Sequence, residues 1–274
     1  MHPLFARRLL FTLAAAPVAA AAVAVAAEAP AIEPAAEVRQ ETGSGALFAG
    51  VQASDLAHSF YFTRLAYPSG GRGRGGGWGT DWPTADRTII SVLDRLTNVD
   101  VQPREHSVRI DEADLRRFPF LYAVEVGSMN LRPEEVEALR NYLLAGGFLV
   151  VDDFWGSYQW ANFEAQIKQV LPEYDIVDIP LDHPVFSTVY QVDEIVQVPV
   201  VNQAIGGGPT YEQDGYVPHC FGIFDEHGRL MVVINWNTDL GDAWEHAENP
   251  RYPLDYSTYA YRMGANFIFY AMTR

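Results

Sequence analysis

Two adjacent carboxylates, Asp152 and Asp153, directly follow the apolar run of residues 148–151. Before this run, a helix pattern that begins at Pro133 stops at the paired glycines of residues 146–147. A helix, a glycine turn and a buried strand in this order predict the carboxyl edge of a parallel sheet, where open α/β proteins hold ligands. One carboxylate could bind a divalent cation or hold a ligand hydroxyl, and the alternative is a helix cap that accepts backbone N–H bonds.

A second concentration of polar groups, residues 235–246, follows another apolar run and should reach the same edge. It contains Asp239, Asp242, Trp244, Glu245 and His246. Alternating acids and tryptophans suit carbohydrate binding, because carboxylates hold hydroxyls and indoles stack on sugar rings. Acids with a nearby histidine also suit metal ions, although no firm ligand spacing is present. The alternative is a capped loop with buried tryptophans.

A histidine in a proline-containing loop, His183, is a further candidate as metal ligand or acid/base group. It could equally fix its loop by a bond to the backbone. The candidate metal set is therefore Asp152, Asp153, His183, Asp239 and Asp242, with a divalent cation as the possible cofactor.

A glycine-rich segment, residues 69–79, follows the first predicted strand and carries Arg72 and Arg74. Successive glycine N–H groups and two arginines could face an anion, but no Walker or dinucleotide motif is present. We expect a lid over the crevice, with Trp78 and Asp81 in contact with whatever lies beneath.

The elements that must position these residues alternate between strand and helix patterns. Strand patterns cover residues 59–66, 99–101, 107–110, 120–126, 148–151, 192–200, 220–224 and 230–235, and helix patterns cover residues 84–97, 133–146, 160–170 and 258–270. Residues 220–235 form a predicted hairpin. The order favours an α/β fold with a flavodoxin-like, doubly wound, mostly parallel sheet.

The N-terminus predicts export. Arg7 and Arg8 precede an uncharged run that ends in small residues near Ala27. We expect a signal peptide over residues 1–27, an Ala/Pro/Glu-rich flexible linker over residues 28–57 and one domain over residues 58–274. The protein would then be periplasmic or extracellular, with no stable membrane span after cleavage. A retained N-terminal membrane anchor is the alternative.

The formal net charge of −16 argues against nucleic acid as a partner, because phosphate binding needs clustered Lys and Arg. Cys220 is the only cysteine, so no intrachain disulfide can form, and we expect it to be a buried thiol.

Several segments resemble the family called domain of unknown function 4159. They are Phe-Pro-Phe-Leu-Tyr at residues 118–122, the run of residues 139–153 that ends in Asp-Asp, Asp-His-Pro-Val-Phe at 182–186, Arg-Met-Gly-Ala-Asn-Phe-Ile-Phe-Tyr at 262–270 and Phe-Thr-Arg-Leu-Ala-Tyr-Pro at 62–68. The resemblance covers about residues 58–274 and implies a class I glutamine amidotransferase-like fold. It lends no established activity. Arg64 and Tyr67 of the last motif, and Trp155 after the two acids, complete the candidate ligand-binding residues.

A glutamine amidotransferase needs a cysteine on a strand-to-helix elbow, with a histidine nearby. The matching elbow here, residues 151–156, has no cysteine, and Cys220 falls in a predicted strand. The sequence therefore argues against amidotransferase activity.

Three functions remain open. The first is a non-catalytic binding module on an amidotransferase-like fold, whose partner would be a carbohydrate or an envelope protein. The second is a metal-assisted hydrolase that uses the acids and His183. The third is a structural envelope protein. The first explains the missing nucleophile most simply.

Overall fold

The computed structural model of the chain describes residues 58–69 and 77–274. The predicted signal peptide 1–27, the linker 28–57 and the two loop arginines, Arg72 and Arg74, lie outside the described residues. Within the described part, no helix is both long and apolar enough to cross a bilayer.

The described strands form one seven-stranded sheet in the order β2–β1–β3–β4–β7–β6–β5. Neighbours from β2 to β7 pair in parallel, whereas β6 is antiparallel to both β7 and β5. The strands are β1 (Thr63–Ala66), β2 (His106–Arg109), β3 (Phe120–Val124), β4 (Phe148–Asp152), β5 (Ile176–Asp178), β6 (His219–Phe224) and β7 (Leu230–Trp236). If the five parallel strands are numbered by their order in the chain, β7 is the fifth, and the order across the sheet is 2-1-3-4-5. This is the flavodoxin-like order, so the predicted fold class is confirmed.

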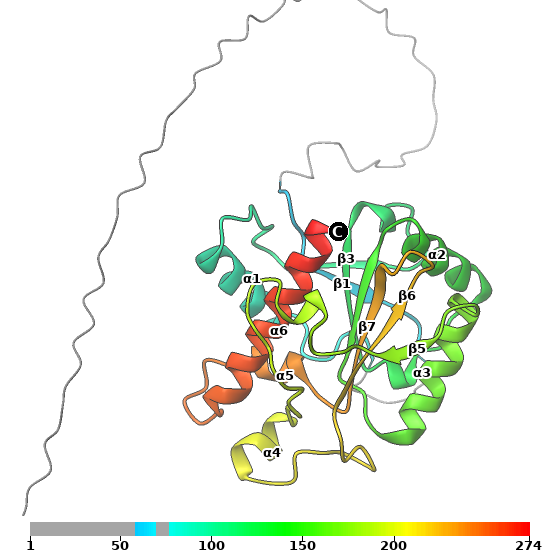
Figure 1. Ribbon diagram of the computed structural model, residues 1–274. Helices are drawn as coiled ribbons and strands as arrows, with labels where there is room; N and C mark the ends of the chain where they lie inside the picture. Colours follow the sequence, from blue (N-terminus) through cyan, green and yellow to red (C-terminus); the bar gives the residue numbers. More distant parts are fainter. Residues whose placement is uncertain (1–57, 70–76) are drawn as a thin grey trace, which may run out of the picture. The chain divides into compact units, whose positions relative to one another are not determined.

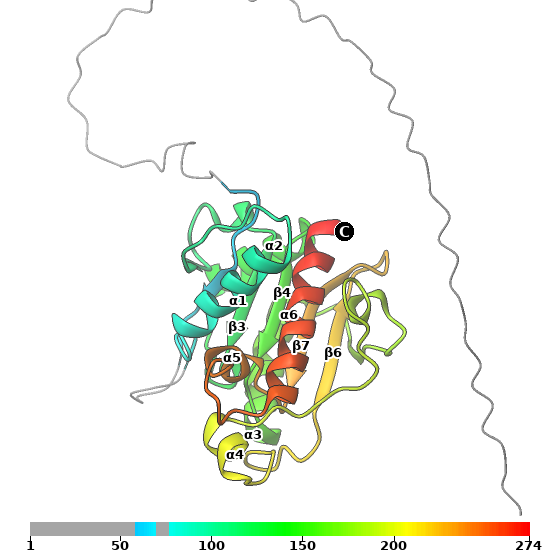
Figure 2. The same ribbon diagram turned by 90° about the vertical axis from the view of Figure 1, so that its left-hand side faces the viewer.

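Helices cover both faces of the sheet (Figure 1). On one face α1, α5 and α6 share a core, and on the other α2 and α3 share a second core. Figure 2 looks onto the face covered by α1, α5 and α6. The helices are α1 (Thr84–Leu96), α2 (Pro133–Leu144), α3 (Gly156–Val170), α4 (Val201–Gly206), α5 (Leu240–Glu245) and α6 (Leu254–Thr273), with short 3₁₀ helices at Leu115–Arg117, Val126–Ser128 and Pro184–Phe186.

The central strands β3 and β4 are buried along their whole length. Helices cover both of their faces, which is why their sequences are continuous apolar runs without alternation. The register pairs Val124 with Asp152, so β4 ends in a carboxylate at the carboxyl edge. Before it, Pro133 occupies the first turn of α2, and Gly146 adopts a φ of 111°, a conformation that favours glycine and ends the helix.

Some predicted elements differ from the structure. Residues 192–200 form no strand, and residues 99–101 contribute only a bridge between Val101 and Phe60. The helix pattern of residues 84–97 places Ile89, Leu93 and Leu96 on one face. Ile89 and Leu93 are buried, but Leu96 is 67% exposed, because α1 ends at this residue. The short elements β5, α4 and α5 have no clear pattern in the sequence. Of these, α5 matters most, since it carries part of the site.

Candidate metal centre

Three carboxylates from distant parts of the chain meet at the carboxyl edge of the sheet. Asp81, Asp153 and Asp239 each place one carboxylate oxygen so that the three oxygens lie within 4.8 Å of one another. Asp153 directly follows β4, Asp239 comes three residues after β7, and Asp81 lies between β1 and α1. The predicted convergence of acids at this edge is therefore present for Asp153 and Asp239. Asp81, predicted only as a contact beneath the lid, completes the group.

Gly241 makes this close approach possible. A Cβ atom at Gly241 would lie 2.5 Å from Oδ2 of Asp81 and 3.4 Å from Oδ1 of Asp239. Any larger side chain would therefore displace Asp81. Asp239 is itself fixed as the N-cap of α5, because its Oδ1 accepts the N–H of Asp242 at 2.7 Å.

Asp153 is held in the group by its backbone and by Trp155. It has a φ of 50°, a left-handed conformation that Asp tolerates better than most residues. Its carbonyl accepts the N–H of Glu125 at 3.0 Å. Its Oδ1 accepts the indole N–H of Trp155 at 3.0 Å. Trp155 is buried, so it positions Asp153 and presents no ring to a ligand.

Asp152 takes the structural role that the sequence left open. Its Oδ2 accepts the Tyr122 hydroxyl at 2.6 Å and the backbone N–H groups of Leu240 at 2.9 Å and Gly241 at 3.3 Å. It therefore caps the first turn of α5 from a neighbouring strand. Its other oxygen, Oδ1, is buried without a hydrogen-bond partner among the described residues.

The site is electrostatically costly without a cation. Burial raises the pKa of Asp81 to about 8 and that of Asp152 to about 7. Burial and then neighbouring carboxylates raise the pKa values of Asp153 and Asp239 well above their ordinary values. Buried carboxylates this close together must hold protons or a cation, because water does not screen them.

Arg64 is a buried cation near the acids, but its guanidinium is already paired with another carboxylate and does not neutralise them. Its guanidinium forms a fully buried ion pair with Asp86 and lies 4.9 Å from the centre of the Tyr122 ring. It also donates to the carbonyl of Thr80 at 3.0 Å. Arg64 lowers the pKa of Asp81, yet burial and the other acids outweigh it. Arg64 thus anchors the segment before Asp81 and is not a free ligand-binding group.

The remaining acid of the predicted metal set, Asp242, lies in a neighbouring group. It places one oxygen within 4.8 Å of single donor atoms of Glu245 and His246. Its Oδ2 accepts the N–H of Val201 at 2.5 Å. Glu245 and His246 were expected at this edge from the sequence, and the spacing Asp-x-x-Glu-His brings them together with Asp242.

Two predicted residues do not serve the predicted chemistry. Trp244 is 1% exposed and packs against Tyr122 and Phe62, at ring distances of 5.2 and 6.0 Å, so it cannot stack on a sugar. His183 lies at the opposite edge of the sheet, since its ring packs against Phe224 and Tyr270 beside the start of β7. Its Nδ1 accepts the N–H of Val185, as the loop-fixing alternative required.

Tyr67 and Trp78 follow β1 in the chain, and neither belongs to the group of three carboxylates. Tyr67 is buried and donates its hydroxyl to the carbonyl of Val124 at 2.5 Å. Trp78 is half-buried and lines a hollow of about 430 Å³ with Arg109 and Arg132. Both of these arginines pair with Asp111, so the hollow is not a free anion site.

Cys220 lies in β6 and is buried, with Sγ 3.5 Å from Oδ1 of Asn235. Burial raises the pKa of its thiol. A thiol in a strand, without an elbow and with a raised pKa, lacks the features of an amidotransferase nucleophile.

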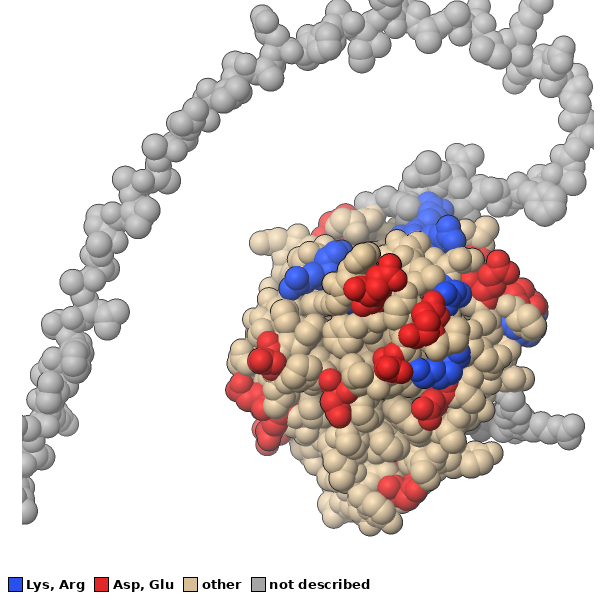
Figure 3. All heavy atoms as spheres, turned by 45° about the vertical axis from the view of Figure 1, so that its right-hand side comes forward, with Lys and Arg blue, Asp and Glu red and all other residues tan. Residues whose placement is uncertain are grey.

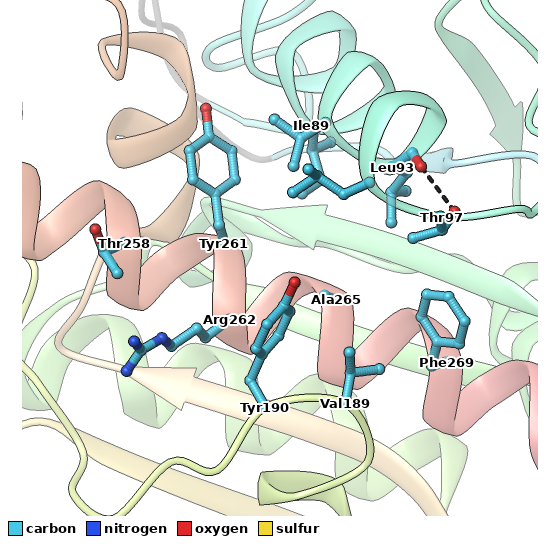
Figure 4. Close-up of a pocket in the computed structure, with 12 residues that line it drawn as sticks. Ile89, Leu93, Thr97, Val189, Tyr190, Thr258, Tyr261, Arg262, Ala265 and Phe269 are labelled. Atoms are coloured by element: carbon cyan, nitrogen blue, oxygen red, sulfur yellow. Dashed lines mark hydrogen bonds between the residues drawn. The ribbon is translucent and has the colours of Figure 1, made fainter. Parts of the chain in front are cut away.

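Among the other hollows of the described surface is an apolar groove of about 250 Å³ between α1 and α6 (Figure 4). Ile89 and Leu93 line one side, and Tyr261, Ala265 and Phe269 line the other. None of the clustered acids lines it. Elsewhere, the face in Figure 3 carries acids interspersed with Lys and Arg and no extended basic patch.

The fold and site together define a doubly wound α/β domain with an acidic carboxyl edge and no cysteine nucleophile at that edge. Residues 61–272 match the family described as Domain of unknown function (DUF4159), and the chain belongs to this family. The resemblance seen in the sequence is thereby confirmed, and every described site residue lies in the matched range. A comparison with curated proteins finds no match.

Proposed function

We propose that this domain is a non-catalytic binding module whose ligand is held through a divalent cation at the carboxyl edge. The observation that carries the proposal is the convergence of Asp81, Asp153 and Asp239, with one oxygen each within 4.8 Å. Three oxygens about 4.5 Å from one another can all lie about 2.6 Å from one ion, which is within the range of Ca²⁺.

The unsatisfied hydrogen bonding of the site supports the same proposal. Oδ2 of Asp81 is buried and has no hydrogen-bond partner among the described residues. A buried oxygen without a partner is destabilising, and a cation would remove this cost together with the repulsion between the acids.

The ion we expect is Ca²⁺. All three donors are carboxylate oxygens, the ligand type that hard cations prefer, and Ca²⁺ is common outside the cytoplasm, where residues 1–27 predict the protein to reside. Three protein ligands would leave coordination positions for hydroxyl or carboxylate groups of a carbohydrate or of an envelope protein. The buried Trp244 removes the stacking surface for sugar, so recognition would depend on the ion.

The alternative of a metal-assisted hydrolase draws on one specific observation. The group of Asp242, Glu245 and His246 adjoins the first group, since the N–H of Asp242 binds Asp239. A nearby histidine and carboxylates could serve as acid/base groups for a metal-bound water.

The test is calorimetric titration of the chelator-treated protein with Ca²⁺. We expect Asp153→Asn to lose binding, although Asn can still accept the Trp155 N–H. Asp214→Asn is the control, because it also removes one carboxylate but Asp214 is exposed and lies outside the three-carboxylate group. Asp152 is unsuitable as a control, because its charge acts on Asp81, Asp153 and Asp239. Equal affinity in the wild type and Asp153→Asn would refute the proposal.

Thermal unfolding provides the second readout. Ca²⁺ at 100 times its Kd should stabilise the wild type by about 2.7 kcal/mol and leave Asp153→Asn unshifted. If Ca²⁺ binds and the protein then hydrolyses model esters or phosphoesters, with turnover lost in Asp153→Asn, the hydrolase would replace the binding module.

A further inference from the structure

The second polar group on α5 differs chemically from the three carboxylates. Asp242, Glu245 and His246 stand at positions i, i+3 and i+4, so their side chains share one face of the helical turn. Nε2 of His246 lies 3.6 Å from Oδ1 of Asp242 and 3.5 Å from Oε2 of Glu245. The donors are thus one imidazole nitrogen and two carboxylate oxygens.

These separations match the requirements of a small transition-metal ion. Zn²⁺ binds nitrogen and oxygen donors at about 2.0–2.2 Å, so two donors in a tetrahedral arrangement lie about 3.4 Å apart. Ca²⁺ rarely takes an imidazole ligand, whereas Zn²⁺ accepts both donor types.

A neighbouring side chain independently indicates an absent ligand. Tyr252 is 6% exposed, and its hydroxyl has no hydrogen-bond partner among the described residues. Its ring centre lies 6.2 Å from that of His246, and it interacts electrostatically with Asp239 and Asp242. A buried hydroxyl without a partner, near His246 and Asp242, fits a place where a further ligand or water would be bound.

The group is also accessible. The side chains of Glu245 and His246 are 26% and 29% exposed, and that of Asp242 is 10% exposed. An ion can therefore reach these donors from solvent without unfolding α5, whereas the acids of the first group, Asp153 and Asp239, are almost fully buried.

We propose that Asp242, Glu245 and His246 form a second cation site, selective for Zn²⁺ or a similar transition-metal ion over Ca²⁺. Three protein ligands leave a fourth position open to water or to a ligand group, with the Tyr252 hydroxyl beside it. The site goes beyond the proposed Ca²⁺-dependent binding and does not depend on it.

The experiment is calorimetric titration of the chelator-treated full-length chain with Zn²⁺ and, separately, with Ca²⁺. We expect His246→Gln to weaken Zn²⁺ binding by at least about tenfold. Loss of a residue that only orients a metal ligand already weakens binding by about this factor, and loss of a ligand itself should cost at least as much. The matched control is His227→Gln. His227 is also exposed and lies 3.6 Å from a single carboxylate, Glu226, so its loss should leave the affinity unchanged.

The two proposals fail separately. Asp153→Asn should lose Ca²⁺ binding and keep Zn²⁺ binding, and His246→Gln should do the reverse. A cooperative thermal unfolding transition in His246→Gln shows that the variant is folded. If it does not fold, Glu245→Gln, at another half-exposed ligand, gives the same test. Unchanged Zn²⁺ affinity in the folded variant, or an equal loss in His227→Gln, would overturn the second site.

Discussion

Replacing the buried carboxylate of Asp152 by an amide should stabilise the cation-free protein at alkaline pH. Burial raises the pKa of Asp152 from 3.8 to about 7. Between these pH values the folded chain binds a proton at Asp152 that the unfolded chain has lost. The free energy of unfolding therefore falls as the pH rises, by about 1.4 kcal/mol per pH unit for this group.

The magnitude follows from the pKa and from the contacts of Asp152. The rise to about 7 corresponds to a loss of about 4 kcal/mol above pH 7 in the wild type. In the Asp152→Asn variant, the amide oxygen can still accept the three hydrogen bonds from Tyr122, Leu240 and Gly241. The amide nitrogen would occupy the place of Oδ1, which has no partner among the described residues, at a cost of about 1–2 kcal/mol. We therefore expect Asp152→Asn to be about 2–3 kcal/mol more stable than the wild type at pH 8 and about equal at pH 5.

Urea unfolding at pH 5, 6, 7 and 8, with chelator present, measures this difference. Asp214→Asn is a control with the opposite sign, because hydrogen bonds from Ser157 lower the pKa of the exposed Asp214 carboxyl, so its charged form is favoured by folding. If Asp152→Asn is the less stable protein at pH 8, or if its stability falls with pH as steeply as that of the wild type, the electrostatic reasoning is refuted.

Two further predictions concern the first cation site. Gly241→Ala should weaken Ca²⁺ binding by displacing Asp81, since the new Cβ would lie 2.5 Å from Oδ2 of Asp81. Gly206→Ala is the control, because the space around its new Cβ is open, and it should leave Ca²⁺ binding unchanged. Equal calorimetric titrations of the two variants would contradict this prediction. Ca²⁺ affinity should rise with pH up to about 8, because Asp81, with a pKa of about 8, must lose its proton to bind the ion. The rise should be about tenfold per pH unit for each proton that the ion displaces. An affinity that stays constant from pH 6 to 8 would exclude Asp81 as a ligand.

The sequence predicted the framework well because its signals were local. Pro133, the glycine stop at Gly146 and the apolar run before Asp152 are each sufficient to define one boundary, and they lie in order along the chain. The carboxyl edge then follows from strand direction alone, which is why Asp153 and Asp239 were expected near each other.

The remaining site residues depend on tertiary contacts that carry no local signal. Asp81 reaches the acids only because Arg64 holds the carbonyl of Thr80 and Gly241 leaves space. His183 was misplaced because the chain reverses after β5: Ile179 still pairs with Cys220, yet four residues later the His183 ring packs against Phe224 at the other edge.

Trp244 illustrates a limit of composition as evidence. A tryptophan between acids has the same local sequence whether its ring stacks on a ligand or fills the core. Here α5 turns the ring inward against Tyr122, while Asp242 and Glu245 of the same helix and His246 at its end form the second polar group. Whether the ring is buried or exposed depends on the direction of α5, which Asp152 and Asp239 fix by capping its first turn.

The capping of α5 also links the two proposed cation sites physically. Asp239 offers a carboxylate to the first group and at the same time accepts the N–H of Asp242, whose own carboxylate belongs to the second. Asp152 holds the preceding two N–H groups of the same turn. An ion bound by Asp81, Asp153 and Asp239 would therefore fix the first turn of α5, and with it the donors of the second site. Each site can bind its ion alone, but when both ions are present we expect the two affinities to be coupled through Asp239 and Asp242, and by linkage the coupling is the same in both directions.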